Sequence, residues 1–454
     1  MQQKNENYWL FDAPVNQAIW HMAIPMMLGM SVNIMYNITD TFFIGKLNNT
    51  SALAAITLLL PYTTVLMALG NLFGTGGSTL FARLLGTKNF EKAKQAAATS
   101  FYLSLFFGLL ATIVTLIFNQ KIALLLGGDT NTSPFVQQYM CYYGIGAPFV
   151  VANFTLEQLI RGNGNSIESM IGMVISVMIN IILDPIFIFT CHLGLKGAAI
   201  ATIIGNISAV IYYIICITKK EHLLSLSLIK MRFKKQLLTE IFTVGFSALL
   251  LDLLLILSSL MFNFYATKYG ENVLAGFGIS QKIVQIVDLI GMGLYLGVIP
   301  LIAVAYGSKN FKKLKLIIRQ TATYLGIIIS LLFVILFFTR HWLMQCFTNQ
   351  AAVIQIGGVI LTVQLCSAFF AAGAGLLTGI FQAEGKGLPA TAMSITRGCI
   401  LIPAIMLGNH FFQVYGVIFS LLVAEAIACL AGFILYLFQP MKINQQLPVK
   451  SEEI

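Results

Sequence analysis

Four polar residues, Asp40, Asn180, Asp184 and Thr202, lie in apolar segments that are long enough to cross a membrane. Asn180 and Asp184 stand one helical turn apart in VMINIILDPIF, so both side chains project from the same face of a helix. A carboxylate at the centre of a bilayer costs about 2.5–3.5 kcal/mol even on the most lenient insertion scale. Residues retained at such a cost usually face a cavity, where they bind an ion, a proton or a cationic ligand.

Pro185 follows Asp184 and has no N–H, so the carbonyl of Ile181 lacks its helical partner. In hydrocarbon, such a carbonyl is tolerated only where another group satisfies it. With the oxygens of the four polar side chains it could form an all-oxygen site, which a hard cation such as Na⁺ prefers. Alternatively, two neighbouring carboxylates in low dielectric repel each other, so that one would hold a proton near neutral pH. A third interpretation is that both Asp residues only hydrogen-bond neighbouring helices.

The elements that position these residues follow from composition. The chain has 454 residues, of which 58% are hydrophobic and 10% charged, and its mean hydropathy is +0.85. This composition predicts an all-α polytopic membrane protein. At about 20 apolar residues per span, the sequence predicts twelve spans. They run near residues 17–44, 52–82, 96–118, 134–160, 167–190, 197–218, 237–266, 273–305, 316–339, 352–383, 390–408 and 415–437.

The net charge of +10 could indicate a nucleic-acid partner, but its distribution argues against one. Most of the 27 Lys and Arg residues fall in the connections after every second predicted span. By the positive-inside rule, these connections and both termini are cytoplasmic. The seven Cys form no CxxC motif or Cys/His cluster, so the sequence predicts no cofactor and no Cys-based metal site.

The sequence contains an internal duplication. The run GTKNFEK, residues 86–92, recurs as GSKNFKK at residues 307–313, and the same offset relates Gly76 to Gly297. We therefore expect two six-helix bundles, 1–218 and 237–454, joined by a basic cytoplasmic linker, 219–236. Six crossings return the chain to its starting side, so the halves are related by a pseudo-two-fold axis along the membrane normal, with a cleft between them. This is the geometry of an alternating-access carrier, and the absence of a GxxxxGK[ST] nucleotide loop from the sequence favours an ion gradient as its energy source.

The two halves differ in their acidic residues. Met261 stands at the position that matches Asp40, and Ile405 or Ile402 at the one that matches Asp184. The ion site is therefore predicted in the first half only.

Further acids in the spans are candidates for the substrate cavity. Glu157 precedes Arg161 by four residues, which fits either a salt bridge within one helix or a role in the cavity. Asp288, in the glycine-rich segment IVDLIGMGLYLG, is the candidate in the second half for attracting a cationic substrate. Asp252 and Glu425 have no supporting neighbours in the sequence, so we expect them to form structural hydrogen bonds.

Five segments, IMYNITDTFFIG, GTKNFEKA, LEQLIRGNGN, NIILDPIFIF and FQAEGKG, resemble the multidrug and toxic compound extrusion (MATE) transporters, most closely their MepA-like bacterial branch. The resemblance covers essentially the whole chain. It implies a V-shaped pair of bundles, a monomer in the bacterial cytoplasmic membrane, that exports lipophilic organic cations such as drugs and dyes in exchange for Na⁺ or H⁺. It also implies that Asp40, Asn180, Asp184 and Thr202 hold the ion. Pro25 and Tyr36 match positions that are linked in the family to bending of the first helix.

Two other functions compete with this interpretation. A flippase for a lipid-linked saccharide precursor of the same superfamily handles an anionic pyrophosphate, and its cleft should be lined by Arg or Lys. Here the ionisable residues within spans are mostly acids. An integral membrane enzyme such as an acyltransferase is disfavoured, because none of the five His forms an HxxxD motif. The sequence thus predicts a cation-coupled efflux antiporter that is not an enzyme.

Overall fold

Every regular element in the described part of the computed structural model, residues 8–46, 49–219 and 223–438, is a helix. Apolar segments in a bilayer must satisfy their own backbone hydrogen bonds, which a helix does within one segment. The elements in chain order are α1 (Tyr8–Phe11), α2 (Val15–Gly45), α3 (Thr50–Gly86), α4 (Phe90–Leu125), α5 (Ser133–Ile145), α6 (Ala147–Gly162), α7 (Ser166–Pro185), the π-helix η1 (Ile186–Thr190), α8 (Leu195–Lys219), the 3₁₀ helix η2 (Leu228–Lys230), α9 (Lys235–Thr267), α10 (Glu271–Gly307), α11 (Phe311–Phe347), α12 (Ala351–Ala383), α13 (Gly387–Cys399) and α14 (Leu401–Phe438).

These helices make twelve crossings. Among the described residues, nine helical segments are long and apolar enough to span a membrane. One of them, Gly387–Phe438, crosses twice, because the chain turns at Gln413, where φ is 52°. The short helices α5 and α6 form one crossing together, and α2 forms the last. The predicted twelve-span membrane protein is confirmed.

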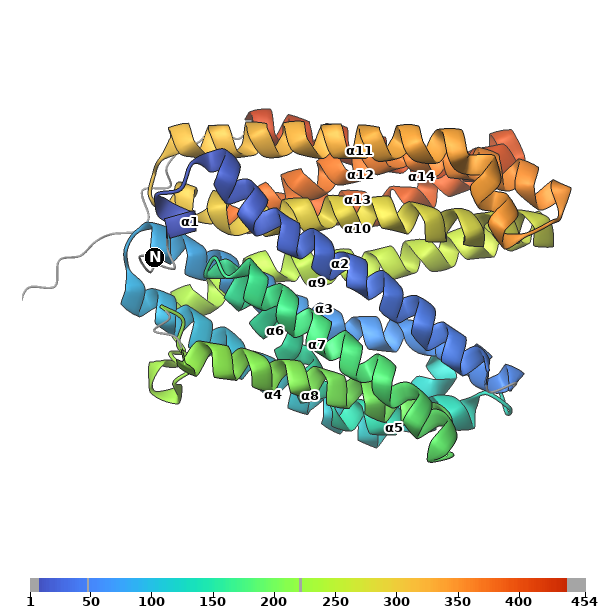
Figure 1. Ribbon diagram of the computed structural model, residues 1–454, viewed down its shortest axis with the longest axis horizontal. Helices are drawn as coiled ribbons and strands as arrows, with labels where there is room; N and C mark the ends of the chain where they lie inside the picture. The colour runs from blue at the N-terminus through green and yellow to red at the C-terminus, as the bar shows by residue number, and fades with distance from the viewer. Residues whose placement is uncertain (1–7, 47–48, 220–222, 439–454) are drawn as a thin grey trace, which may run out of the picture.

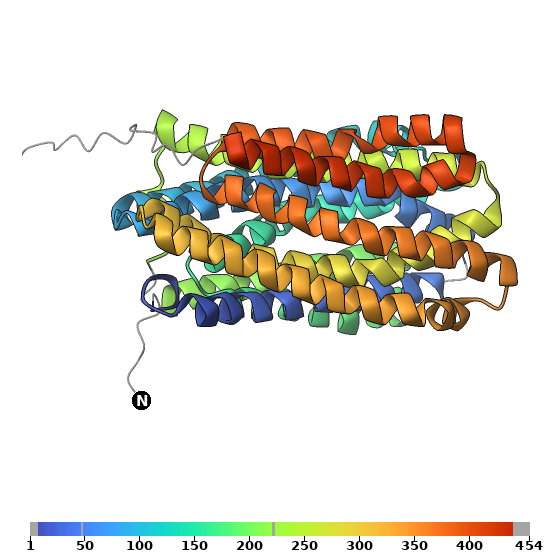
Figure 2. The ribbon, with the colours of Figure 1, turned by 90° about the horizontal axis from the view of Figure 1, so that it is seen from above.

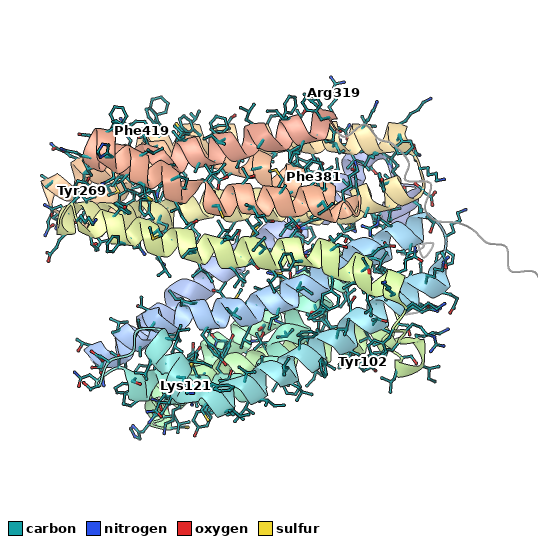
Figure 3. All side chains as sticks on the ribbon, turned by 180° about the vertical axis from the view of Figure 1, so that it is seen from behind. Tyr102, Lys121, Tyr269, Arg319, Phe381 and Phe419 are labelled. Atoms are coloured by element: carbon teal, nitrogen blue, oxygen red, sulfur yellow. The ribbon has the colours of Figure 1, made fainter. Side chains whose placement is uncertain are left out.

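The crossings form two bundles, α2–α8 and α9–α14, which Figure 1 shows as a lower and an upper group with α2 running diagonally between them. Figures 1 and 2 show that the helices share the long axis of the molecule. The bundles meet mainly through α3 against α9 and through α10 against α2. Figure 3 shows that they diverge toward the end that carries Lys121 and Tyr269, which we call the open end. They converge at the opposite end, near Tyr102 and Arg319, which we call the closed end.

The duplicated sequence positions make equivalent contacts between the bundles. Gly76 of α3 lies against the carbonyl of Ile241 in α9, where a Cβ atom would come within 2.1 Å of that oxygen. Its counterpart Gly297 of α10 lies against the carbonyl of Met22 in α2, where a Cβ atom would come within 2.7 Å. Only glycine allows backbones to approach so closely. The two contacts are related by the pseudo-two-fold axis. The internal duplication in the sequence therefore corresponds to equivalent helix packing in the two halves.

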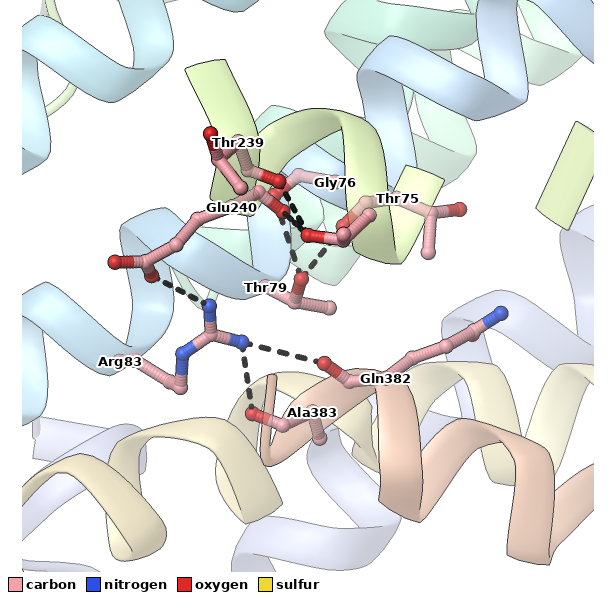
Figure 4. Close-up of polar contacts among 9 residues, drawn as sticks. Thr75, Gly76, Thr79, Arg83, Thr239, Glu240, Gln382 and Ala383 are labelled. Carbon is pink, nitrogen blue, oxygen red and sulfur yellow. Dashed lines mark hydrogen bonds and ion pairs between the residues drawn. The ribbon is translucent and has the colours of Figure 1, made fainter. Parts of the chain in front are cut away.

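Arg83 of α3 joins the two bundles at the closed end (Figure 4). It is 9% exposed, and its Nη1 atom donates to the carbonyl oxygens of Gln382 and Ala383, both at 3.3 Å, in the last turn of α12. Its Nη2 atom donates to Glu240 Oε2 of α9 at 3.2 Å. A guanidinium suits this position, because it presents several donors in one plane and the C-terminal end of a helix attracts positive charge. We call this set of contacts the Arg83 latch.

Candidate functional site

A cavity of about 620 Å³ lies between the two bundles. This volume is within the usual range for sites that bind small molecules. Residues from α2, α3 and α5–α8 line one side, and residues from α9, α10, α12 and α13 line the other. Much of the wall is formed by flexible or aromatic apolar side chains, including Met30, Met67, Phe154, Met173 and Met292. Such side chains accommodate apolar ligands of different shapes.

The structure brings Asn180, Asp184 and Thr202 together beside this cavity. Asp184 is fully buried in α7, and Asn180, one turn earlier, is 2% exposed. The Asn180 amide lies 3.1 Å from Thr202 Oγ1 of α8 and, with its nitrogen toward the carboxylate, 3.1 Å from Asp184 Oδ2. Asn180 and Thr202 line the cavity, whereas Asp184 is not among its lining residues. The amide therefore connects the buried carboxylate with the space in which a solute would bind.

The chain continues beyond Asp184 in a π-helix rather than an α-helix. Pro185 ends α7, and the N–H of Cys191 then bonds to the carbonyl of Ile186 at 2.8 Å. This five-residue hydrogen-bond spacing widens the helix, and π-helical turns are frequent at functional sites. A π-helical segment thus begins two residues after the buried carboxylate.

The predicted residues of the first transmembrane helix are only partly described. The backbone of α2 is continuous through Pro25, which is buried, and through Tyr36 and Asp40. The side chains of Tyr36 and Asp40 lie outside the described part of the structure. Their contribution to the ion site and to bending of α2 therefore remains a prediction from the sequence.

Two further Asn residues extend the polar group formed by Asn180, Asp184 and Thr202. Asn206 Nδ2 of α8 donates to the carbonyl of Thr202 at 2.7 Å. Its Oδ1 atom accepts from Asn153 Nδ2 of α6 at 2.8 Å. Both Asn side chains line the cavity. Neither Asn was predicted from the sequence, although Asn206 follows Thr202 by one helical turn, a spacing that places both on one face.

For Glu157 the sequence allowed either a place in the cavity or a salt bridge with Arg161. The structure shows both, because Glu157 lines the cavity and also pairs with Arg161. Its Oε1 atom lies 3.3 Å from Nη1 of Arg161, one turn later in α6. Both side chains are less than a tenth exposed. The pair therefore adds no net charge to the wall.

Asp288, the other cavity candidate, is not among the lining residues. It lies on α10 one turn before Met292, which does line the cavity, and it interacts electrostatically with Arg397 and Glu425. Arg397 Nε lies 3.4 Å from Glu425 Oε2, and Arg397 reaches the cavity wall. The second half thus holds a group of one cation and two acids. This ion pair agrees with the structural hydrogen bonding that was expected for Glu425.

Asp252 of α9 lines the cavity and accepts a hydrogen bond from Asn71 Nδ2 at 2.8 Å. The structural hydrogen bond expected for Asp252 is present, whereas its place in the cavity wall was not predicted. No sequence signal marks its partner, because Asn71 belongs to the other half, 181 residues away.

The fold and the cavity together define a class of protein: a multi-pass membrane carrier built from two repeated helix bundles around a shared site. The MatE family profile matches the chain twice, over residues 25–186 and 248–407, once in each half. The chain therefore belongs to the MatE, or multidrug and toxic compound extrusion, family.

Individual relatives agree with this assignment. The chain is 39% identical to the "Multidrug export protein MepA" of Staphylococcus saprophyticus, over 95% of its own length and 96% of that protein. It is 38% identical to the protein of that name from Staphylococcus aureus strain N315, with the same coverage. Among solved structures, it resembles an "outward-facing conformation of a multidrug resistance MATE family transporter" with a TM-score of 0.90 and 24% identity, over 96% of this chain and 98% of the other.

Proposed function

We propose that this protein is a secondary active antiporter that exports lipophilic organic cations from a bacterial cell in exchange for Na⁺ or H⁺. The observation that carries this proposal is one cavity shared by both halves, with Asn180 and Thr202 in its wall and the Asp184 carboxylate directly behind them. The MepA relatives, which are named as multidrug exporters, support the same class of substrate. The flippase alternative is disfavoured, because Arg161 and Arg397 in the cavity wall are each paired with a carboxylate.

The position of the three polar residues supports a coupling mechanism. We propose that the ion enters from the cavity, exchanges places with the amide contacts of Asn180 and binds between Asp184 and Thr202, where every side chain offers oxygen. Asp40 and the bending of α2 at Pro25 and Tyr36 are proposed to complete this site. Ion and drug then stabilise different conformations of the same bundle, so that loading one expels the other. Neither a cofactor nor a second subunit is required by this scheme.

The same proposal fixes an orientation in the membrane. Lys and Arg gather in the connections at the closed end, which the positive-inside rule places in the cytoplasm together with both termini. The open end then faces outward, and the Arg83 latch closes the cytoplasmic side. The boundaries proposed for the two functional halves are 1–218 and 237–454, with 219–236 as the linker.

Export should follow an imposed ion gradient. In proteoliposomes loaded with ethidium, an inward gradient of the coupling ion is expected to accelerate dye release, and an equal gradient of the other cation is not. Separate Na⁺ and pH gradients identify the ion. Exchange of one H⁺ for one monovalent dye moves no net charge, so an imposed voltage would then have no effect on the rate. Dye release that ignores both gradients would exclude an antiporter.

Two native cysteines test the orientation. Cys191 and Cys346 are exposed at the open end, whereas the other five cysteines are only partly accessible. In intact cells, a membrane-impermeant maleimide should label the protein at these two residues, and replacing both with Ser should remove the labelling. As the opposite control, Lys312→Cys, an exposed position at the closed end, should react only after the cells are permeabilised. Labelling with the reverse pattern would invert the proposed topology.

A further inference from the structure

Asp252 joins the two halves at the cavity itself. It lies in α9 of the second half, and its Oδ2 atom accepts from Asn71 Nδ2 in α3 of the first half at 2.8 Å. Both side chains line the cavity. The contact therefore crosses the boundary between the halves at the place where a solute would bind.

Neutral side chains continue this contact into the first half. Gln158 Nε2 donates to Asn71 Oδ1 at 2.7 Å, and Thr75 Oγ1 donates to Gln158 Oε1 at 2.8 Å. Each amide accepts with its oxygen and donates with its nitrogen, so all donors of the chain point toward the carboxylate of Asp252. The chain solvates the negative charge without supplying a positive one.

The charges on the rest of the described wall are balanced locally. Glu157 is paired with Arg161 at 3.3 Å, and Arg397 is paired with Glu425 at 3.4 Å. Asp252 forms no such pair among the described residues; its polar contact is with the neutral Asn71. When ionised, it gives the described wall a negative charge that no neighbouring side chain neutralises.

We propose that Asp252 is the carboxylate that binds the positive centre of the transported cation. This inference rests on the proposed function and assigns a specificity-determining residue to it. A single unpaired carboxylate in a wall of aromatic and thioether side chains fits a monovalent lipophilic cation, whose apolar groups contact residues such as Phe154 and Met67. A neutral or anionic solute of the same shape gains nothing from this charge.

Binding at Asp252 also affects the contact between the halves. Asn71 donates to the carboxylate, and a cation that approaches the same oxygens competes with that amide. A bound substrate therefore replaces a contact between the two bundles with a contact to itself. Substrate binding at the proposed site thus weakens a contact that holds the two halves together, which makes it easier for them to move apart.

The test is a binding measurement on the purified full-length protein in nanodiscs. The probes are tetraphenylphosphonium, a monovalent lipophilic cation, and triphenylphosphine oxide, a neutral molecule with similar rings. Asp252→Asn removes the charge and keeps the shape, Asp252→Glu keeps the charge, and Asn71→Ala removes the neutral partner. Glu271→Gln, at the exposed start of α10, is the matched control for loss of an acid elsewhere.

Asp252→Asn should raise the Kd for tetraphenylphosphonium about tenfold or more, because truncating one member of a desolvated charge pair typically costs at least that much. Affinity for the neutral probe should stay within about twofold. Asp252→Glu and Glu271→Gln should retain cation binding, and Asn71→Ala, which removes the amide that competes for the carboxylate, should lower the Kd for the cation. Unchanged cation affinity in a folded Asp252→Asn protein would overturn the assignment while leaving gradient-driven export intact. Absence of gradient-driven export by the wild type would instead remove the proposed function itself.

Discussion

Replacement of Asp184 by Asn should abolish ion-coupled export while the protein still folds. Asp184 is fully buried next to Asn180, and an amide has the same shape as the carboxylate it replaces. The loss of a buried charge that binds a cation costs about 3–5 kcal/mol, which corresponds to a loss of ion affinity between about 150-fold and about 5,000-fold. Gradient-driven ethidium export from proteoliposomes measures this loss directly.

Thr202→Val is the graded comparison for Asp184→Asn. It removes a neutral ligand whose hydrogen bond contributes about 0.5–1.5 kcal/mol, so export should fall by tenfold or less. The difference in export between the two variants is more informative than either value. If these residues formed only structural hydrogen bonds, removing the charge of Asp184 while keeping its shape would not have the larger effect. Wild-type export by Asp184→Asn would show that the coupling ion binds elsewhere.

The number and limits of the spans were predictable because hydrocarbon leaves a chain few alternatives. Without water, each crossing must be a helix of membrane length, so apolar length alone defines the elements. The lengths of several spans predicted kinks, but not the positions of the interruptions. The predicted span 134–160 is divided at Gly146, and the span after residue 387 is divided at Ile400. Pro148 and Pro403, which lack the N–H that continues a helix, explain both breaks.

The candidate site was predictable where its members are local in sequence. Asn180 and Asp184 share a helix face by their spacing, and Thr202 lies on the next helix, which packs antiparallel against the first. The contact between Asp252 and Asn71 was not predictable, because it depends on how two separate bundles dock. A sequence shows which helices are amphipathic or charged, but it gives little information on which faces of distant helices meet.

The hydrogen bonds of the Arg83 latch stabilise the contact between the two bundles at the closed end. Hydrogen bonds that involve a charged group contribute about 1.5–3 kcal/mol each, and Arg83 makes two to the end of α12. These bonds exist only while the bundles are in contact at the closed end, so they stabilise this conformation, which is the outward-open state in the proposed orientation, relative to the inward-open one. Their total corresponds to a shift of about 100-fold or more in that equilibrium.

Arg83→Ala should therefore shift the carrier toward the inward-open state by about 100-fold. The measurement uses Thr64→Cys, a position in the cavity wall, in a protein whose native cysteines are replaced by Ser. The ratio of maleimide labelling rates from the two sides of oriented vesicles reports the equilibrium between the two states.

Two further variants separate the parts of the latch. Glu240 is 36% exposed, and ion pairs with such partners contribute about 0–1 kcal/mol, so Glu240→Gln should change the ratio by fivefold or less. Arg83→Lys keeps the charge but replaces the planar fork with a single ammonium, which does not reach both carbonyls and Glu240 in the same geometry. It should lie between wild type and Arg83→Ala. Equal ratios in all four proteins would mean that close packing of the backbones at Gly76 and Gly297, rather than the guanidinium, keeps the bundles together at the closed end.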